Sequence, residues 1–223
     1  MFPTTRRFAF SAVLAASALT ASSASAATLT LSRACYAYDS SAEVPIEATA
    51  SGLAANTFHS LRLSSTETLG PSGSTSGTSD ASGNLGLTIS SYFGGSSSKI
   101  QSNDASVALT DLNGTVVATA TTKTAPVAAD VTGSGKYRNW KVSGLSTLTG
   151  GTTYYAHYFN NNKYKGRLKI GKASGPCGIY KGKRPLTPFS KLGRYDVKIT
   201  TTKHWAAGDQ FIAGRIVVTK RYS

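Results

Sequence analysis

Residues 163–172 read KYKGRLKIGK, and cations alternate with uncharged residues from Lys163 to Ile170. Every second residue is uncharged, namely Tyr164, Gly166, Leu168 and Ile170. The residues between them are all cations, namely Lys163, Lys165, Arg167 and Lys169. Successive side chains of a β-strand point to opposite faces, so this alternation predicts a half-buried antiparallel strand with four cations on its outer face.

Short β-rich runs separated by turn residues extend over the rest of the chain, and helical periodicity is weak. The first half contains seven such runs, at 28–33, 44–50, 57–64, 73–79, 85–91, 105–111 and 115–121. The second half contains seven more, at 126–132, 136–144, 153–160, 163–172, 177–182, 193–201 and 211–221. Seven short strands at this spacing are typical of a β-sandwich, so the sequence predicts two all-β sandwiches in tandem.

The first 26 residues have the pattern of a cleaved signal peptide. Arg6 and Arg7 precede an apolar run at 8–19, which is too short to cross a bilayer, and Ala24-Ser25-Ala26 is a small-x-small cleavage site. The alternative is a transmembrane anchor or a core helix. The pattern favours export to the cell envelope or the extracellular space, with the Sec and twin-arginine routes both open.

Charge divides the mature chain close to residue 122. Residues 27–122 hold three Lys/Arg and seven Asp/Glu, which gives a net charge of −4. Residues 123–223 hold nineteen Lys/Arg and three Asp/Glu, which gives +16, and they also contain both tryptophans. So sharp a change is more typical of two modules than of one. We therefore expect an acidic domain at 27–122 and a basic domain at 123–223.

Three stretches resemble known exported proteins. TLTLSRACYAYDSSAEVPIEATASGLAANT at 28–57 resembles the first strands of bacterial secreted Ig-like modules. YAHYFNNNKYKGRLKIGKASGPCG at 155–178, followed by GRYDVKI, is similar to the C-terminal domain of exported actinobacterial proteins of unassigned function. Tyr195, two residues before Val197, resembles the tyrosine corner of immunoglobulin-like domains. The resemblance implies two tandem Ig-like antiparallel β-sandwich domains and supplies no catalytic residues.

Cys35 and Cys177 are the two cysteines of the chain, and two interpretations of them stay open. In an exported protein they are candidates for a disulfide, and the alternative is a pair of buried free thiols. A sortase-like transpeptidase would instead use Cys177 as nucleophile, His157 as base and Arg167 as oxyanion donor. The SGPCG sequence around Cys177 lacks the Thr-rich motif of that enzyme family.

Other catalytic and metal-binding motifs are missing from the sequence. There is no HExxH, CxxC or G-x-S-x-G pattern, so zinc and serine-nucleophile chemistry have no support. Asp80, Ser82 and Asn84 carry side-chain oxygen atoms at alternate positions, as a calcium loop does. A plain Asx turn accounts for the same residues without a bound ion, so it is the favoured interpretation. We therefore expect a protein that is not an enzyme and carries no cofactor or metal.

The cations of the second half predict a surface for a polyanion, because their self-repulsion is relieved when a polyanion binds. The candidate binding residues are Lys163, Lys165, Arg167, Lys169, Lys181, Lys183 and Arg184. Export makes an anionic cell-wall polymer the expected partner, with another envelope protein as a further possibility. The alternatives are a nonspecific extracellular nucleic-acid binder and a stalk whose charge has no specific ligand.

Overall fold

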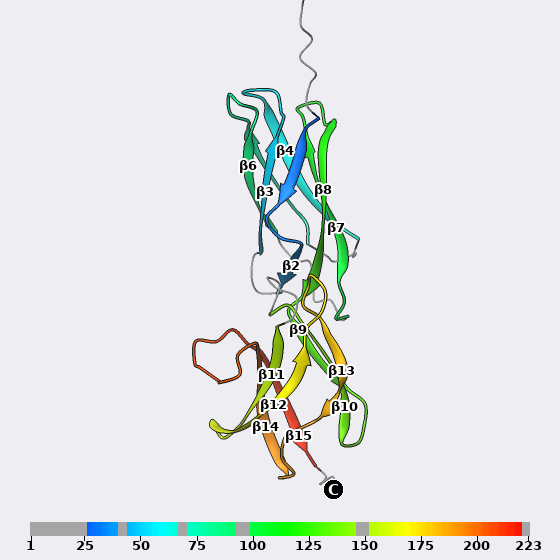
Figure 1. Ribbon diagram of the computed structural model, residues 1–223, viewed down its shortest axis with the longest axis vertical. Coiled ribbons are helices and arrows are strands. Elements are labelled where there is room, and N and C mark those ends of the chain that lie inside the picture. Colours follow the sequence, from blue (N-terminus) through cyan, green and yellow to red (C-terminus); the bar gives the residue numbers. More distant parts are fainter. Residues whose placement is uncertain (1–25, 40–43, 67–70, 92–98, 146–151, 220–223) are drawn as a thin grey trace, which may run out of the picture.

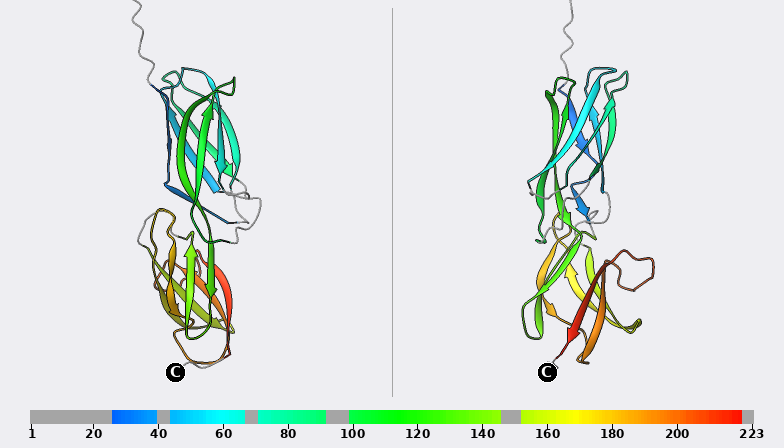
Figure 2. Two further views of the ribbon diagram at one scale, coloured as in Figure 1. Left: turned by 90° about the vertical axis from the view of Figure 1, so that its right-hand side faces the viewer. Right: turned by 180° about the vertical axis from the view of Figure 1, so that it is seen from behind.

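The computed structural model describes residues 26–39, 44–66, 71–91, 99–145 and 152–219, so residues 1–25 of the expected signal peptide lie outside it. Within those ranges the chain forms strands and turns without any helix, which confirms the all-β class. Figure 1 shows two bodies joined end to end, one containing β1 to β8 and the other β9 to β15. Figure 2 shows the same elongated arrangement from two other sides.

The first body is a sandwich of two sheets. The smaller sheet has the order β1-β3-β6 and contains β1 (Thr28–Leu31), β3 (Val44–Ser51) and β6 (Leu85–Ser91). The larger sheet has the order β2-β8-β7-β4-β5 and contains β2 (Cys35–Tyr38), β4 (Phe58–Ser65), β5 (Gly73–Thr78), β7 (Asn103–Thr110) and β8 (Val116–Pro126). Alternate residues of both sheets point inward and form one apolar core, which includes Ile46, Ile89, Leu61 and Val107.

The second body is also a two-sheet sandwich, and it carries the candidate site. Its smaller sheet has the order β13-β10-β9 and contains β9 (Ala128–Thr132), β10 (Tyr137–Ser143) and β13 (Tyr180–Pro185). Its larger sheet has the order β12-β11-β14-β15 and contains β11 (Thr153–Asn160), β12 (Lys163–Lys172), β14 (Gly193–Thr200) and β15 (Ile212–Val218). The core between the sheets includes Trp140, Tyr154, Tyr158 and Val197.

Both sandwiches connect their strands in the same order. When β2 is left out, each sandwich has seven strands in chain order. The first, second and fifth of them form the smaller sheet, and the other four form the larger sheet. The fourth strand, β5 or β12, therefore pairs with the third, whereas constant-type Ig domains place their fourth strand in the other sheet. The first sandwich has one strand more than the second, because β2 pairs in parallel with the end of β8.

The fourteen predicted strands all overlap observed ones, and the differences have local causes. β2 was not predicted, because CYAY is only four residues long and no turn residues of its own mark it off as a separate strand. The strand predicted at 177–182 begins only at Tyr180, because Gly175 and Gly178 adopt positive φ in a tight turn before it. β8 continues to Pro126, so the boundary predicted after residue 122 falls inside this strand.

The tyrosine corner expected at Tyr195 is present. Its phenolic hydroxyl donates to the carbonyl oxygen of Lys191 at 3.1 Å, and its ring is almost completely buried. This contact fixes the start of β14 against the segment that leads into it. The resemblance to Ig-like sandwiches at this position is therefore confirmed by geometry.

A disulfide between Cys35 and Cys177 closes the joint between the two sandwiches. The two Cα atoms are 5.2 Å apart, and the pair packs with Ala125 and Ile179 in a small core of its own. This confirms the predicted disulfide and makes the free-thiol alternative wrong. A backbone bond from Val127 to the carbonyl of Tyr38, 2.6 Å long, ties the same joint where β8 passes directly into β9. Covalent and hydrogen-bonded links therefore connect the two bodies.

Candidate functional site

The outer face of the larger sheet in the second sandwich is the candidate site. Tyr154, Ala156 and Tyr158 of β11 are fully buried in the core, so the alternate residues His157 and Phe159 point to the outer face. Register pairs His157 with Arg167 on β12 and with Lys198 on β14. Phe159 pairs with Tyr164 on β12. Aromatic and cationic side chains thus meet across three adjacent strands.

The prediction that all four β12 cations share one face is wrong. The pairing of β11 with β12 shifts register twice, which leaves Lys165 and Ile170 without opposite residues in two β-bulges. Arg167 and Lys169 lie on the outer face as expected. Beyond the bulge at Lys165 the alternation is reversed, so Tyr164 joins the outer face and Lys163, opposite Asn160, lies on the other side of the strand.

The bulges bring Tyr164 into an aromatic cluster on that face. Its ring centroid lies 5.6 Å from that of Phe159 and 6.1 Å from that of His157. The segment between β14 and β15 adds Trp205 and Phe211, whose ring centroids are 5.5 Å apart. Trp205 also lies 5.5 Å from Phe159. These separations are typical of stabilising edge-to-face aromatic pairs.

One lysine lies at the centre of the cluster. The Lys198 Nζ is 4.4 Å from the Trp205 ring centroid, 4.6 Å from that of Phe211 and 5.4 Å from that of Phe159. Cation–π attraction over these rings stabilises the arrangement and keeps positive charge at the surface. We define the aromatic-basic face as this cluster and three cations of β12, namely Phe159, Tyr164, Trp205, Phe211, Lys198, Lys165, Arg167 and Lys169. Lys163 flanks this face from the other side of the strand.

The segment at 201–211 has internal bonds that hold it over the sheet. The Asp209 carboxylate accepts from the Thr202 hydroxyl at 2.6 Å and from the Ala206 backbone N–H at 2.9 Å. Both bonds hold the pKa of Asp209 below its usual value. From β12, the Arg167 guanidinium donates to the Lys203 carbonyl at 2.8 Å. Arg167 therefore joins β12 to the segment as well as contributing charge.

His157 supports the segment from beneath. Its side chain has no exposed surface, and its Nε2 lies 3.1 Å from both the Thr200 hydroxyl and the Thr202 carbonyl. Burial lowers the pKa of His157, against the opposing effects of the Thr202 carbonyl and Asp209, so the ring is neutral at pH 7. A neutral, buried imidazole under a surface segment has a structural role.

The transpeptidase-like alternative requires a thiol that the structure does not supply. Cys177 is bonded to Cys35, and the described residues include no free cysteine. The nucleophile assigned to Cys177 is therefore wrong for the oxidised protein, and His157 and Arg167 have the structural contacts described above. The wider expectation that the protein is not an enzyme stays a prediction.

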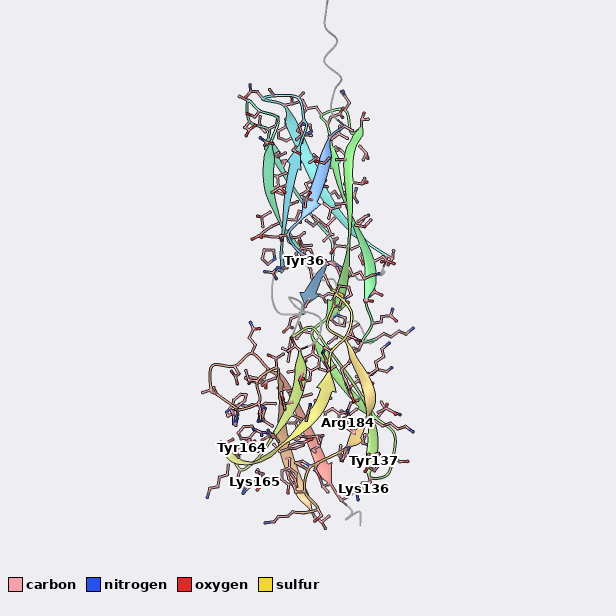
Figure 3. All side chains as sticks on the ribbon, viewed as in Figure 1. Tyr36, Lys136, Tyr137, Tyr164, Lys165 and Arg184 are labelled. Atoms are coloured by element: carbon pink, nitrogen blue, oxygen red, sulfur yellow. A yellow bond between two sulfur atoms is a disulfide. The ribbon has the colours of Figure 1, made fainter. Side chains whose placement is uncertain are left out.

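The other predicted cations lie on the smaller sheet. Lys181 and Lys183 of β13 are exposed, and their register partners on β10 are Lys141 and Asn139. Arg184 bonds instead across the side of the sandwich, where its Nε donates to the Ile170 carbonyl of β12 at 2.5 Å. Figure 3 shows Arg184 well apart from Tyr164 and Lys165, which lie together near the 201–211 segment. The structure thus divides the predicted set between two sheets.

The turn at Asp80 is an Asx turn, as expected. The Asp80 Oδ1 accepts from the backbone N–H groups of Ser82 and Asn84, each at 2.8 Å. These bonds lower the pKa of Asp80, with the Asn84 bond as the largest cause. In the part of the chain that the structure describes, no three His, Cys, Asp or Glu side chains come together as a metal site. The same residues also contain no helix that is long and apolar enough to cross a membrane.

Sequence reasoning missed four members of the aromatic-basic face, namely Tyr164, Lys198, Trp205 and Phe211. Lys198 occupies an outward position of GRYDVKIT, where alternation with Tyr195, Val197 and Ile199 was a usable signal. Trp205 and Phe211 belong to the segment between strands. No local pattern predicts which way such a segment folds.

Comparisons with known proteins add little to this description. No protein-family model and no curated protein matches the chain. A crystal structure of a tetra-tandem repeat from the extending region of a large adhesion protein is similar at 14% identity, with a TM-score of 0.30. The match covers 86% of this chain and 48% of that one, so the chain spans about half the length of its structural neighbour. So low a TM-score carries no conclusion about function.

Proposed function

We propose that this is an exported, non-catalytic protein whose second sandwich binds an anionic, sugar-containing polymer of the cell envelope. The aromatic-basic face is the observation that carries the proposal. It places exposed cations beside exposed aromatic rings on one side of a domain with a net charge of +16. That charge is well above what solubility alone requires of a domain this size.

No carboxylate among the described residues forms an ion pair with a lysine of β12. Among the described residues the ion pairs are Lys123–Asp104 and Arg215–Asp196. Asp209, the other carboxylate near the face, is engaged by Thr202 and Ala206. Lys163, Lys165 and Lys169 are exposed and repel one another, and a polyanion would relieve that repulsion.

The aromatic rings favour a polymer with flat or apolar groups along its backbone. Tyr164 is 49% exposed and Phe211 is 40% exposed, although both pack against other rings on one side. Such half-covered rings offer a rigid surface for stacking, which a polymer made only of phosphate would not use. Sugar rings joined by anionic groups would use the rings and the lysines together.

The first sandwich and the joint are suited to act as a spacer. The two bodies lie end to end (Figure 1). The Cys35–Cys177 disulfide joins them covalently. Residues 27–122 have a net charge of −4, so an anionic wall would repel the first body while it attracts the second. The proposed arrangement anchors the basic end and holds the acidic end away from the polymer.

Sedimentation with purified cell wall tests the proposal. We expect the mature protein to pellet with wall that retains its anionic polymers and to stay in solution with wall stripped of them. The triple variant Lys163→Gln, Lys165→Gln and Lys169→Gln should stay in solution with both, because it removes three surface cations. Arg167 is kept, since it also bonds the Lys203 carbonyl.

A second triple variant is the matched control. Lys141→Gln, Lys181→Gln and Lys183→Gln removes the same charge from the smaller sheet and should pellet nearly as well as the wild type. Equal loss in both variants would show that net charge, and not the aromatic-basic face, drives binding. Retention by stripped wall would contradict the proposal, and stronger competition by duplex DNA than by wall polymer would favour the nucleic-acid alternative.

A further inference from the structure

The first sandwich shows how an added strand closes one edge of its larger sheet. β2 pairs in parallel with β8, with Cys35 to Tyr38 opposite Lys123 to Pro126. The inward side chain of Tyr36 is 2% exposed and belongs to the core between the sheets. A strand of four residues is therefore enough to pair with this edge and to supply an aromatic residue to the core.

The second sandwich lacks a counterpart of β2. β15 corresponds to β8 and ends its sheet, and no strand in the described ranges pairs with its free edge. β9, the strand nearest to that edge on the smaller sheet, pairs only with β10. An unpaired edge leaves backbone N–H and C=O groups available to another extended chain.

A groove of about 450 Å³ runs between β9 and β15, where the missing strand would lie. Its lining includes Val131, Trp140, Ile199, Gly214 and Ile216. A Cβ added to Gly214 would meet no heavy atom within 4 Å, so space is open above this residue. The groove therefore has room for a side chain that the protein itself does not provide.

Trp140 gives a second, independent observation. Its indole Nε1 is buried in the wall of the groove and has no hydrogen-bond acceptor among the described residues. A buried donor without an acceptor is costly, and an oxygen atom of an added strand would relieve that cost. Arg138 and Arg215 also line the groove. The Nε of Arg215 is bonded to Asp196, and the remaining guanidinium N–H groups of Arg215 favour a strand that carries carboxylates.

We propose that the free edge of β15 accepts an extended acidic peptide in parallel, as β8 accepts β2. Its apolar or aromatic side chains, at every second position, enter the groove beside Gly214 and Trp140. The carboxylates between them face Arg215 and the basic surroundings. This surface is separate from the aromatic-basic face and does not depend on the proposed polymer.

Fluorescence of Trp140 tests the proposal with a defined probe. The variant Trp205→Phe leaves Trp140 as the one tryptophan of the chain. We expect a saturable change in its emission on titration with the blocked heptapeptide YEYEYEY. The blocked peptide YYYYEEE has the same composition without alternation and should bind at least about tenfold more weakly.

The variant Gly214→Leu supplies the structural control. It fills the open space, so we expect an unchanged or higher midpoint of thermal unfolding and at least about tenfold weaker peptide binding. The lysine variant of β12 should keep peptide binding, which separates this proposal from the polymer proposal. No saturable signal, equal binding of both peptides, or full binding by a folded Gly214→Leu protein would overturn it. A dimer that forms without peptide and is lost in Gly214→Leu would assign the edge to a second copy instead.

Discussion

Replacing both Cys35 and Cys177 with serine is expected to lower the free energy of unfolding by about 3–5 kcal/mol. The disulfide joins residues 142 positions apart, so it removes a large closed loop from the unfolded chain. The chain-entropy model gives about 5 kcal/mol for a loop of this length, and measured values are often smaller. Both residues are changed together because a single substitution would leave a buried, unpaired thiol.

Urea denaturation of the wild-type and double-serine proteins measures this change, and reduction of the wild type should reproduce it. Because each sandwich has its own core, we also expect the double variant to unfold in two separate transitions. A loss below about 1 kcal/mol would show that the joint is stabilised mainly by its other contacts. The backbone bond between Val127 and Tyr38 would then be the first of those contacts to examine.

Gly171→Ala is expected to cost about 2–5 kcal/mol, because it combines backbone strain with overpacking. Gly171 lies in β12 with a φ of 156°, which is unfavourable for a residue with a side chain. An added Cβ would overlap the ring of Tyr180, 2.8 Å from Cδ2 and closer still to Cε2. That ring is packed in the core, so it has little room to move.

Gly86→Ala is the matched control for this prediction. Gly86 also lies in a strand, but a Cβ there would meet nothing within 4 Å. Its substitution should change the free energy of unfolding by less than about 1 kcal/mol. Similar thermal unfolding of the two variants would contradict the close packing of β12 against Tyr180 that supports the candidate site.

Alternating patterns made the fold largely predictable. GRYDVKIT and TYYAHYFN alternate or concentrate apolar residues in short runs, and each became a strand at the expected position. The disulfide was one of two interpretations that the cysteines left open, and the expected export made it plausible. The sequence could not show that this bond links the two sandwiches at their joint, because that depends on how distant segments meet.

The bulges of β12 were the main limit on predicting the site. The residues from Lys163 to Ile170 alternate without a break, yet Lys165 and Ile170 each lack an opposite residue on β11. A bulge depends on the partner strand as well as on the strand itself, so a single sequence pattern does not reveal it. The cations were predicted from charge alone, whereas the aromatic cluster around Lys198 arises from tertiary packing of the 201–211 segment.

The salt dependence of binding to purified anionic wall polymer tests the central claim most directly. Counterion release predicts that the slope of log K against log salt becomes shallower by about 0.7–0.9 for each cation lost. For the triple variant of Lys163, Lys165 and Lys169, the slope should therefore be shallower by about 2–3 than for the wild type. Its affinity at low salt should be roughly 100-fold lower. An unchanged slope in that variant, or an equal change in the Lys141, Lys181 and Lys183 variant, would contradict the aromatic-basic face as the polymer site.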